Sequence, residues 1–260
     1  MDDVRRAWLH GLLVAGAVLL AAERASPRTA GDPVRIVWDE GDVAGVTSIY
    51  GPDGGEPIGF VEYHQTRRGE LLTCARIARY RDGTRDEDEA TARLSGTLEA
   101  IAGRSVVRDR DGEPIAEVTI DVAGGRLQGA WGRGSDRQAL DRRVVLPSGT
   151  YWGPLIFLVV KNFDANAEGG RVVFHTVAPS PRPMELDMEL VRGEPSRLDR
   201  AGSTVETRRL DLRPTVHWAL DPVIHLVVPP ATFYLLPGEP PGLVRFAGPR
   251  NYARQPIRIE

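Results

Sequence analysis

Cysteine is almost absent from this sequence, since Cys74 is the only one among 260 residues. No intramolecular disulfide can therefore form, and a metal site built from several thiolates is excluded. The stability of the fold has to come from the size of its core instead. Cys74 lies in a stretch of alternating apolar residues, which predicts a buried and unreactive thiol in preference to a reactive one.

The sequence also lacks an excess of charge of one sign. It contains 33 basic and 36 acidic residues and carries a formal net charge of −3. The arginines are interspersed with acidic residues along the whole chain, whereas nucleic-acid binding usually requires a basic patch. Nucleic acid is therefore not an expected partner.

Common catalytic motifs are missing as well. The chain has no G-x-S-x-G elbow, Walker loop, G-x-G-x-x-G turn or H-E-x-x-H helix, and we expect no metal or other cofactor. A hydrolase or metal enzyme remains a less favoured alternative, because catalytic groups can come from distant segments. His217 and His225 flank a predicted hairpin turn and could meet across two strands as a metal or acid/base pair, although hydrogen-bonded structural histidines are the favoured interpretation.

Long apolar runs are rare, and the clearest one lies near the N-terminus. Arg5 and Arg6 precede the run from Gly11 to Ala22 (GLLVAGAVLLAA), whose 12 residues fall short of the ~20 that a transmembrane helix needs. This arrangement predicts a secretory signal over residues 1–25, with an uncleaved N-terminal anchor as the alternative. We therefore expect a periplasmic or secreted protein, which the anchor would tether to the inner membrane.

The body of the chain is dominated by period-two alternation. In Met184–Leu190 (MELDMEL) every second residue is apolar and the residues between them are acidic, and Ala116–Val122 alternates in the same way. The 28 glycines and 20 prolines fit frequent turns between short strands. Further strands are predicted at 34–39, 43–50, 57–66, 70–80, 89–95, 97–108, 126–132, 170–178, 204–212, 215–219, 223–228, 231–236 and 242–247.

So many two-faced strands cannot lie flat, because each has an apolar face that must be buried. The predicted fold is mainly β: a single antiparallel curled sheet or half-open β-barrel that wraps a short helix, with residues 32–260 as one β-rich domain. The helix is predicted within Gly153–Phe163 (GPLIFLVVKNF), after Pro154. The β-branched residues of this segment also allow a buried strand. A helix that is apolar all round needs burial on every side, which places it inside the sheet as a plug or lid.

Two charged segments are predicted to be turns. The acidic run Asp86–Glu89 (DEDE) is interpreted as a solvated hairpin tip in preference to a calcium site, because its spacing matches no calcium loop. The segment Asp109–Gly112 (DRDG) resembles part of an EF-hand loop but lacks the remaining ligands, so a plain hairpin turn is predicted.

Several short motifs carry a family resemblance. They are Tyr80–Ala90 (YRDGTRDEDEA), Val145–Pro147 (VLP), Val160–Asn162 (VKN), Pro237–Pro241 (PGEPP) and Gly248–Pro249. From Tyr80 onward the chain resembles a group of uncharacterised secreted bacterial proteins, although Asp88 and Glu89 stand where that pattern has uncharged residues. Its layout is also similar to the DUF3108 type of envelope family. The resemblance implies an envelope location and an open, lipocalin-like or lipoprotein-carrier-like β-barrel around a short helix, and it implies no activity.

The leading functional hypothesis is an exported carrier that holds a hydrophobic or lipid-like ligand inside the half-barrel. Its candidate ligand-binding residues lie on or near the predicted plug: Trp131, Trp152, Phe157, Phe163, Phe174 and His175. Simple core packing is the alternative for each of the aromatic residues. The alternative function is a structural or interaction module of the cell envelope with a protein partner.

Overall fold

Antiparallel strands make up most of the chain. The computed structural model describes residues 29–178, 183–200, 202–215, 230–250 and 255–260. The predicted signal at 1–25, His217, His225, the strand predicted at 223–228 and most of the one at 215–219 lie outside these residues.

The described strands pair into one sheet, together with two short helices and one 3₁₀ turn. The elements are β1 (Val34–Arg35), β2 (Val43–Gly51), β3 (Gly54–Arg68), β4 (Leu71–Tyr80), β5 (Arg85–Leu94), β6 (Thr97–Arg108), β7 (Pro114–Asp121), β8 (Arg126–Trp131), η1 (Gly134–Asp136), β9 (Gln138–Arg143), α2 (Leu155–Lys161), α3 (Phe163–Asn166), β10 (Arg171–Ala178), β11 (Met184–Arg192), β12 (Ser196–Arg200), β13 (Ser203–Pro214), β14 (Ala231–Leu236), β15 (Gly242–Pro249) and β16 (Pro256–Ile259).

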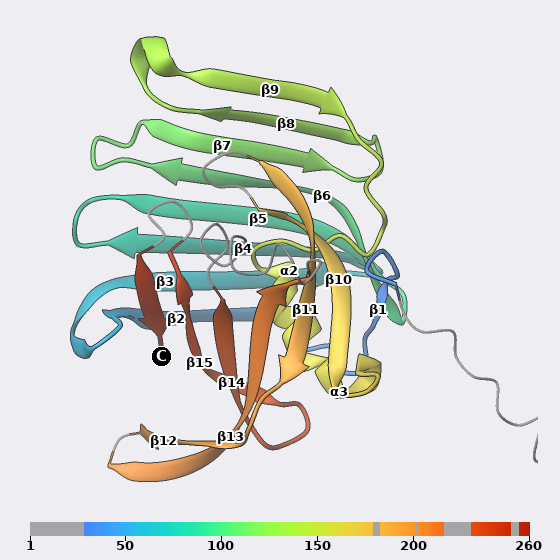
Figure 1. The fold of residues 1–260 in the computed structure, drawn as a ribbon, viewed down its shortest axis with the longest axis vertical. Helices are drawn as coiled ribbons and strands as arrows, with labels where there is room; N and C mark the ends of the chain where they lie inside the picture. The colour runs from blue at the N-terminus through green and yellow to red at the C-terminus, as the bar shows by residue number, and fades with distance from the viewer. Residues whose placement is uncertain (1–28, 179–182, 201, 216–229, 251–254) are drawn as a thin grey trace, which may run out of the picture.

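The sheet is an open curl rather than a closed barrel. Its strand order is β10-β11-β13-β14-β15-β16-β2-β3-β4-β5-β6-β7-β8-β9, so β9 and β10 are its two free ends. Strand β1 pairs with β6, and β12 extends from β13, both outside this order. From β2, in the middle of the sheet, the chain winds outward to β9 and then returns through β10 to β16, which pairs with β2. Strands β10 to β15 cross in front of β2 to β9 and enclose α2 (Figure 1). The predicted mainly-β, half-open architecture is confirmed.

The helical plug is confirmed too, as α2. Pro154 precedes it with a φ of −67°, the value that its ring imposes and that suits a helix start. Leu155, Leu158, Val159 and Val160 are all buried. The alternative of a buried strand is wrong, because Leu155–Lys161 is helical and the concave sheet covers its buried face.

Two asparagines hold the helical segment in place. Asn162 Oδ1 accepts hydrogen bonds from the backbone N–H groups of Val37 and Trp38, each 2.8 Å long. Asn166 Oδ1 accepts one of 2.7 Å from the N–H of Arg35. These hydrogen bonds hold residues 35–38, which precede β2, against the C-terminal ends of α2 and α3. This explains why β1 ends at Arg35, well short of the predicted 34–39, since side chains satisfy the backbone groups that a longer strand would have paired.

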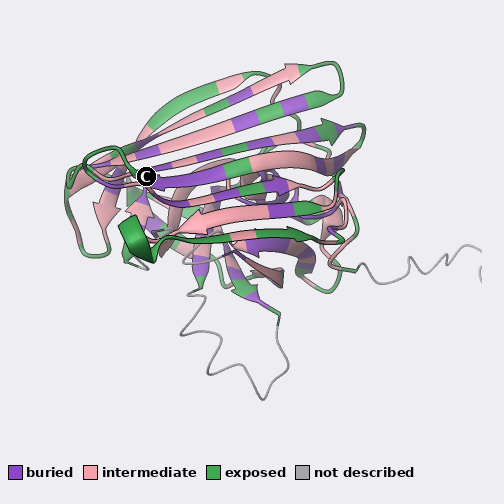
Figure 2. Cartoon of the chain, turned by 90° about the horizontal axis from the view of Figure 1, so that it is seen from above, coloured by how far each residue is buried: buried purple, intermediate pink, exposed green. Residues whose placement is uncertain are grey.

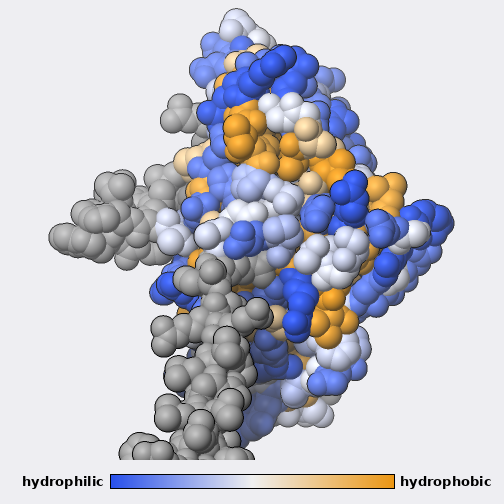
Figure 3. Space-filling model, turned by 90° about the vertical axis from the view of Figure 1, so that its right-hand side faces the viewer, coloured by the Kyte–Doolittle hydropathy of each residue, from blue (hydrophilic) through white to orange (hydrophobic). Residues whose placement is uncertain are grey.

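Alternation along the strands produces the core, as Figure 2 shows by its alternating buried and exposed segments. The largest fully buried side chains come from both halves of the sheet and from the helix, and include Tyr151, Phe174, Phe233, Leu72, Leu98, Ile120, Leu127, Leu155 and Leu190. Tyr151 also joins distant segments, because its hydroxyl donates to Leu98 O at 2.6 Å and accepts from Val34 N at 2.7 Å. The face shown in Figure 3 is largely hydrophilic, with hydrophobic residues gathered in patches.

Some strands were not predicted. Strands β9 and β12 are short and rich in charged residues, and β16 has only four residues, too few for its two isoleucines to stand out as a pattern. All three form because a paired neighbour supplies their hydrogen bonds. The turn at Asp109–Gly112 is confirmed, with Gly112 N donating to Asp109 O at 3.1 Å. Within the described ranges, none of the helices has both the length and the apolar character needed to cross a lipid bilayer.

The prediction for the acidic run is wrong. Asp86 to Glu89 do not form a solvated hairpin tip but belong to β5, whose burial alternates from residue to residue. Asp86 is 1% exposed and Asp88 2% exposed, both on the concave side. Their burial is possible because Arg76, on the neighbouring strand β4, supplies a positive charge beside them.

Candidate functional site

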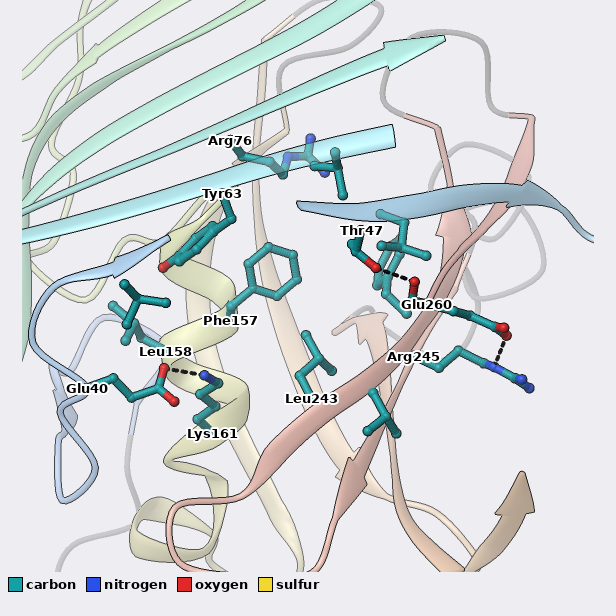
Figure 4. A pocket seen from close by; sticks show the side chains of 15 residues that line it. Glu40, Thr47, Tyr63, Arg76, Phe157, Leu158, Lys161, Leu243, Arg245 and Glu260 are labelled. Atoms are coloured by element: carbon teal, nitrogen blue, oxygen red, sulfur yellow. Dashed lines mark hydrogen bonds and ion pairs between the residues drawn. The ribbon is translucent and has the colours of Figure 1, made fainter. Parts of the chain in front are cut away.

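Two neighbouring cavities lie inside the curl of the sheet, beside α2; their volumes are about 230 and 190 Å³, and we call them the first and the second lobe. Arg76, Phe157 and Phe246 line both lobes and therefore lie between them, at the place we call the junction. Figure 4 shows the first lobe, with Tyr63 and Arg76 on the side of β3 and β4, Phe157 on α2, and Leu243 and Arg245 on β15.

Local strand geometry explains why these side chains meet. Residues of one phase in β3 (Val61, Tyr63) and in β4 (Cys74, Arg76) face inward because side chains alternate between the two faces. Phe157 projects from α2 toward these strands. Its ring lies edge-on to the rings of Tyr63 and Phe233, with centroid distances of 6.1 and 6.2 Å. The helix thus divides the interior instead of filling it.

The first lobe adjoins a gap in the wall of the sheet. Strand β16 is short and pairs with β2 only through Tyr50 and Ile49, and with β15 only from Phe246 to Pro249. Beyond the end of β16, the described residues of β2 and β15 are not bridged by another strand. Val43 and Thr47 of β2 and Leu243 of β15 line the lobe at this point. We therefore place the entrance of the cavity between β2 and β15.

Ion pairs surround this entrance. Lys161 pairs with Glu40 on one side. On the other side Arg245 and Arg258 both contact Glu260 Oε1, with Arg258 Nε at 2.7 Å. These charged side chains are 18–28% exposed, whereas the walls of the lobe are mainly apolar.

A buried ion pair sits at the junction of the lobes. Arg76 Nε donates to Asp88 Oδ2 at 2.9 Å, and Nη2 contacts the same oxygen. Ser105 Oγ donates to the other oxygen, Oδ1, at 2.7 Å. The side chains of Arg76 and Asp88 are 12% and 2% exposed. Such a pair is held only because each charge neutralises the other away from water.

Asp86 is the second buried carboxyl of the cluster. Tyr80 donates a hydrogen bond of 3.1 Å to its Oδ2, while Oδ1 is buried without a hydrogen-bond partner among the described residues. Burial is the main cause that raises the pKa of Asp86 to about 6; Arg76 and Arg250 oppose the rise, and the charge of Asp88 adds to it. Arg250 also stacks on Tyr80, 3.5 Å from the ring centroid.

Cys74 is buried in a small polar group of the same wall, which confirms its predicted burial. Tyr63 donates to Gln65 Oε1 at 2.8 Å and lies 3.7 Å from Cys74 Sγ. Burial raises the pKa of the Cys74 thiol to about 11, although the hydrogen bond from Tyr63 lowers it in part.

Cys74 is therefore expected to react with a disulfide reagent such as DTNB roughly a hundredfold more slowly than an exposed thiol at pH 8, because little thiolate forms. The measurement is the rate of thiol release in buffer and in urea, where unfolding should restore a fast reaction. Val46, which is 70% exposed on the outer side of β2, offers a control: Val46→Cys in a Cys74→Ser background should react quickly. A fast reaction of native Cys74 would contradict its placement in the wall.

The candidate ligand-binding residues predicted from the sequence lie in different parts of the structure. Trp152 lines the second lobe and Phe157 both lobes. Phe163 is buried on α3 beside Arg192, and Phe174 is buried against Tyr151. Trp131 lies in a separate hollow between β8, β9 and the start of β11.

His175 is on β10, outside the linings of the two lobes. Its Nδ1 lies 2.8 Å from Asp187 Oδ1, and its Nε2 is buried without a hydrogen-bond partner among the described residues. Among those residues, no three His, Cys, Asp or Glu side chains are grouped so that they could hold a metal ion.

Sequence reasoning missed Arg76, Asp86 and Asp88. A signal was present, because Asp86 and Asp88 are in phase with Ala90, Ala92 and Leu94 on the same strand, all of which are buried. Arg76 is likewise in phase with Leu72, Cys74 and Ala78. Charged residues at the alternate positions of a strand that are otherwise apolar are therefore a sequence signal for buried charges.

Comparison with known proteins adds little detail. No protein-family model matches the chain, and no curated protein matches it. Among solved structures the chain is similar to a β-barrel-like protein of a domain of unknown function, DUF1849, from Brucella abortus, with 11% sequence identity over 87% of this chain and 96% of that one, and a TM-score of 0.43.

Proposed function

We propose that the protein is an exported binding or carrier protein that shelters a hydrophobic or lipid-like ligand inside its half-open barrel. The observation that carries the proposal is the pair of adjoining lobes beside α2, of about 230 and 190 Å³. Together they reach the lower part of the size range of small-molecule sites, which are concave, mostly apolar and marked by a few polar groups.

The lining supports an apolar ligand. Aromatic and aliphatic side chains such as Phe157, Leu158, Leu243 and Phe246 form most of the walls, and charges are restricted to the entrance and to the Arg76–Asp88 pair. Protein interiors are close-packed, with few voids larger than a water molecule. A helix that only completed the core would be expected to fill this space, so the remaining volume favours a bound molecule.

The proposal of export depends on the apolar run at residues 11–22 after Arg5 and Arg6. An envelope location would give a carrier of lipid-like molecules access to membranes. The alternative, an interaction module with an envelope protein partner, would use an unpaired strand such as β9. However, β9 carries Asp141, Arg142 and Arg143, and charges on an edge strand discourage pairing with another chain.

The decisive experiment is native mass spectrometry and solvent extraction of the purified protein. We expect a co-purifying lipid-like molecule at close to one per chain, and the same spectra report whether residues 1–25 have been removed. A consistently empty protein that also fails to bind an apolar fluorescent probe would overturn the proposal.

Blocking the cavity tests its location. Leu243→Trp should fill the first lobe and reduce binding of the apolar probe by about tenfold or more, since a bulky side chain takes the space of the ligand. The matched control is Val46→Trp, on the outer face of the neighbouring wall, which should bind the probe normally. Binding is measured by probe fluorescence, with thermal melting to show that both variants fold. Equal binding by the two variants would contradict the assignment of the site.

A further inference from the structure

The guanidinium of Arg76 has spare hydrogen-bonding capacity inside the cavity. Its Nε and Nη2 are both directed to Asp88 Oδ2. Nη1, which carries two further N–H groups, forms no hydrogen bond with any described residue. Arg76 lines both lobes, so its side chain lies at the junction between them.

The other polar groups at the junction are already engaged. Ser105 Oγ donates to Asp88 Oδ1 at 2.7 Å, and Thr176 Oγ1 donates to Tyr151 O at 2.5 Å. Nη1 has no partner and is not among the fully buried side-chain atoms of the described residues that lack one, so it is accessible within the site. A donor of a charged group that gains an acceptor in such a partly buried place contributes to binding. Arg76 Nη1 is therefore the group at this junction with most to gain from a polar atom of a ligand.

The charge balance favours an uncharged acceptor. Arg76 and Asp88 neutralise each other, and burial already raises the pKa of neighbouring Asp86 to about 6. The interior thus disfavours a second negative charge beside the pair. A carbonyl oxygen accepts a hydrogen bond without adding charge.

On the basis of the proposed function, we infer that the ligand is an ester-linked or amide-linked acyl amphiphile whose carbonyl oxygen accepts a hydrogen bond from Arg76 Nη1. The carbonyl then lies at the junction next to Phe157. The acyl chain occupies the second lobe, and the remainder of the molecule extends through the first lobe to the entrance between β2 and β15.

The test compares two ligands that differ only in the carbonyl. A medium-chain 1-monoacylglycerol and the 1-monoalkylglycerol ether of equal length compete with an apolar fluorescent probe for the wild-type protein. The ester should bind about tenfold more tightly than the ether. This ratio corresponds to the lower end of what a hydrogen bond to a charged group contributes. It should also bind more tightly than the matching fatty acid at pH 8, which is ionised.

Each result bears on the inference. Equal binding of ester and ether would overturn it but would still be consistent with a purely hydrophobic carrier. Strongest binding of the fatty acid would also overturn it, because Arg76 would then recognise an anionic head group and not a carbonyl. Failure of all three ligands to displace the probe would also overturn it. Absence of any co-purified lipid and of probe binding would remove the proposed function itself.

A variant and a spectroscopic signature tie the effect to Arg76. In Arg76→Met/Asp88→Asn, which removes both charges together, the ester should lose its advantage over the ether. In the wild type, the infrared band of a ¹³C-labelled ester carbonyl should move to lower frequency on binding. An unshifted band would overturn the inference even if the variant failed to fold.

Discussion

Replacing Arg76 with methionine is expected to lower the free energy of unfolding by about 3–5 kcal/mol at neutral pH, the usual cost of breaking a buried ion pair. The substitution leaves Asp88, which is 2% exposed, without its positive partner. A neutral donor such as the Ser105 hydroxyl does not replace the positive charge that offsets the lost solvation of this carboxylate. Urea unfolding followed by circular dichroism measures the change.

Two control variants distinguish the effect of leaving a buried charge unpaired from the effect of losing an arginine side chain. Arg126 pairs with Asp141 across β8 and β9, but their side chains are 52% and 51% exposed. Arg126→Met should therefore cost no more than about 1 kcal/mol, as exposed ion pairs do. Arg76→Met/Asp88→Asn should recover most of the loss, because no isolated charge remains. Similar losses for Arg76→Met and Arg126→Met would contradict the buried pair.

Replacing Asp86 with asparagine is expected to stabilise the protein above pH 6 and to remove part of its pH dependence. The pKa of Asp86 is raised in the folded protein from 3.8 to about 6, mainly by burial. The folded state therefore holds a proton that the unfolded state releases, so this group's stabilising contribution is full below pH 4 and is lost as pH rises to about 6. The difference between the folded and unfolded pKa values of Asp86 corresponds to about 3 kcal/mol in the free energy of unfolding.

The measurement is the free energy of unfolding of wild type and Asp86→Asn from pH 4 to pH 8. The difference between the two proteins should increase in favour of the variant from pH 4 to just above pH 6 and then level off. Asp42 gives a control of opposite sign: hydrogen bonds from Arg67 and Arg68 lower its pKa, so its contribution is present above its unfolded pKa and lost as pH falls. A constant difference across pH for Asp86→Asn would show that Asp86 is ionised throughout.

The fold was predictable where the signal is local. Met184–Leu190 and Ala116–Val122 alternate strictly, and glycine or proline marks the turns between strands, so most of the strands could be placed to within a few residues. Pro154 followed by an apolar run was sufficient for the helix. By contrast, β16 has only four residues, and its pairing with β2 joins opposite ends of the chain, a contact that no local pattern encodes.

The candidate site was predictable only in part. Trp152 and Phe157 were found because bulky aromatic residues near a plug are natural cavity walls. Asp86 and Asp88 were missed because both phases of β5 begin with charged residues, and the inward phase becomes apolar only from Ala90 onward.

The sequence by itself determined most of the segments that become strands, where they turn, and that they must bend around an apolar interior, since these depend on side-chain period and backbone preference over short distances. Only the tertiary structure decided that the sheet stays open between β9 and β10, that α2 leaves two lobes unfilled, and that Arg76 faces Asp88 at their junction. These features depend on register and on contacts between residues far apart in the chain, where the free energy of burying a charge is set by a partner on another strand.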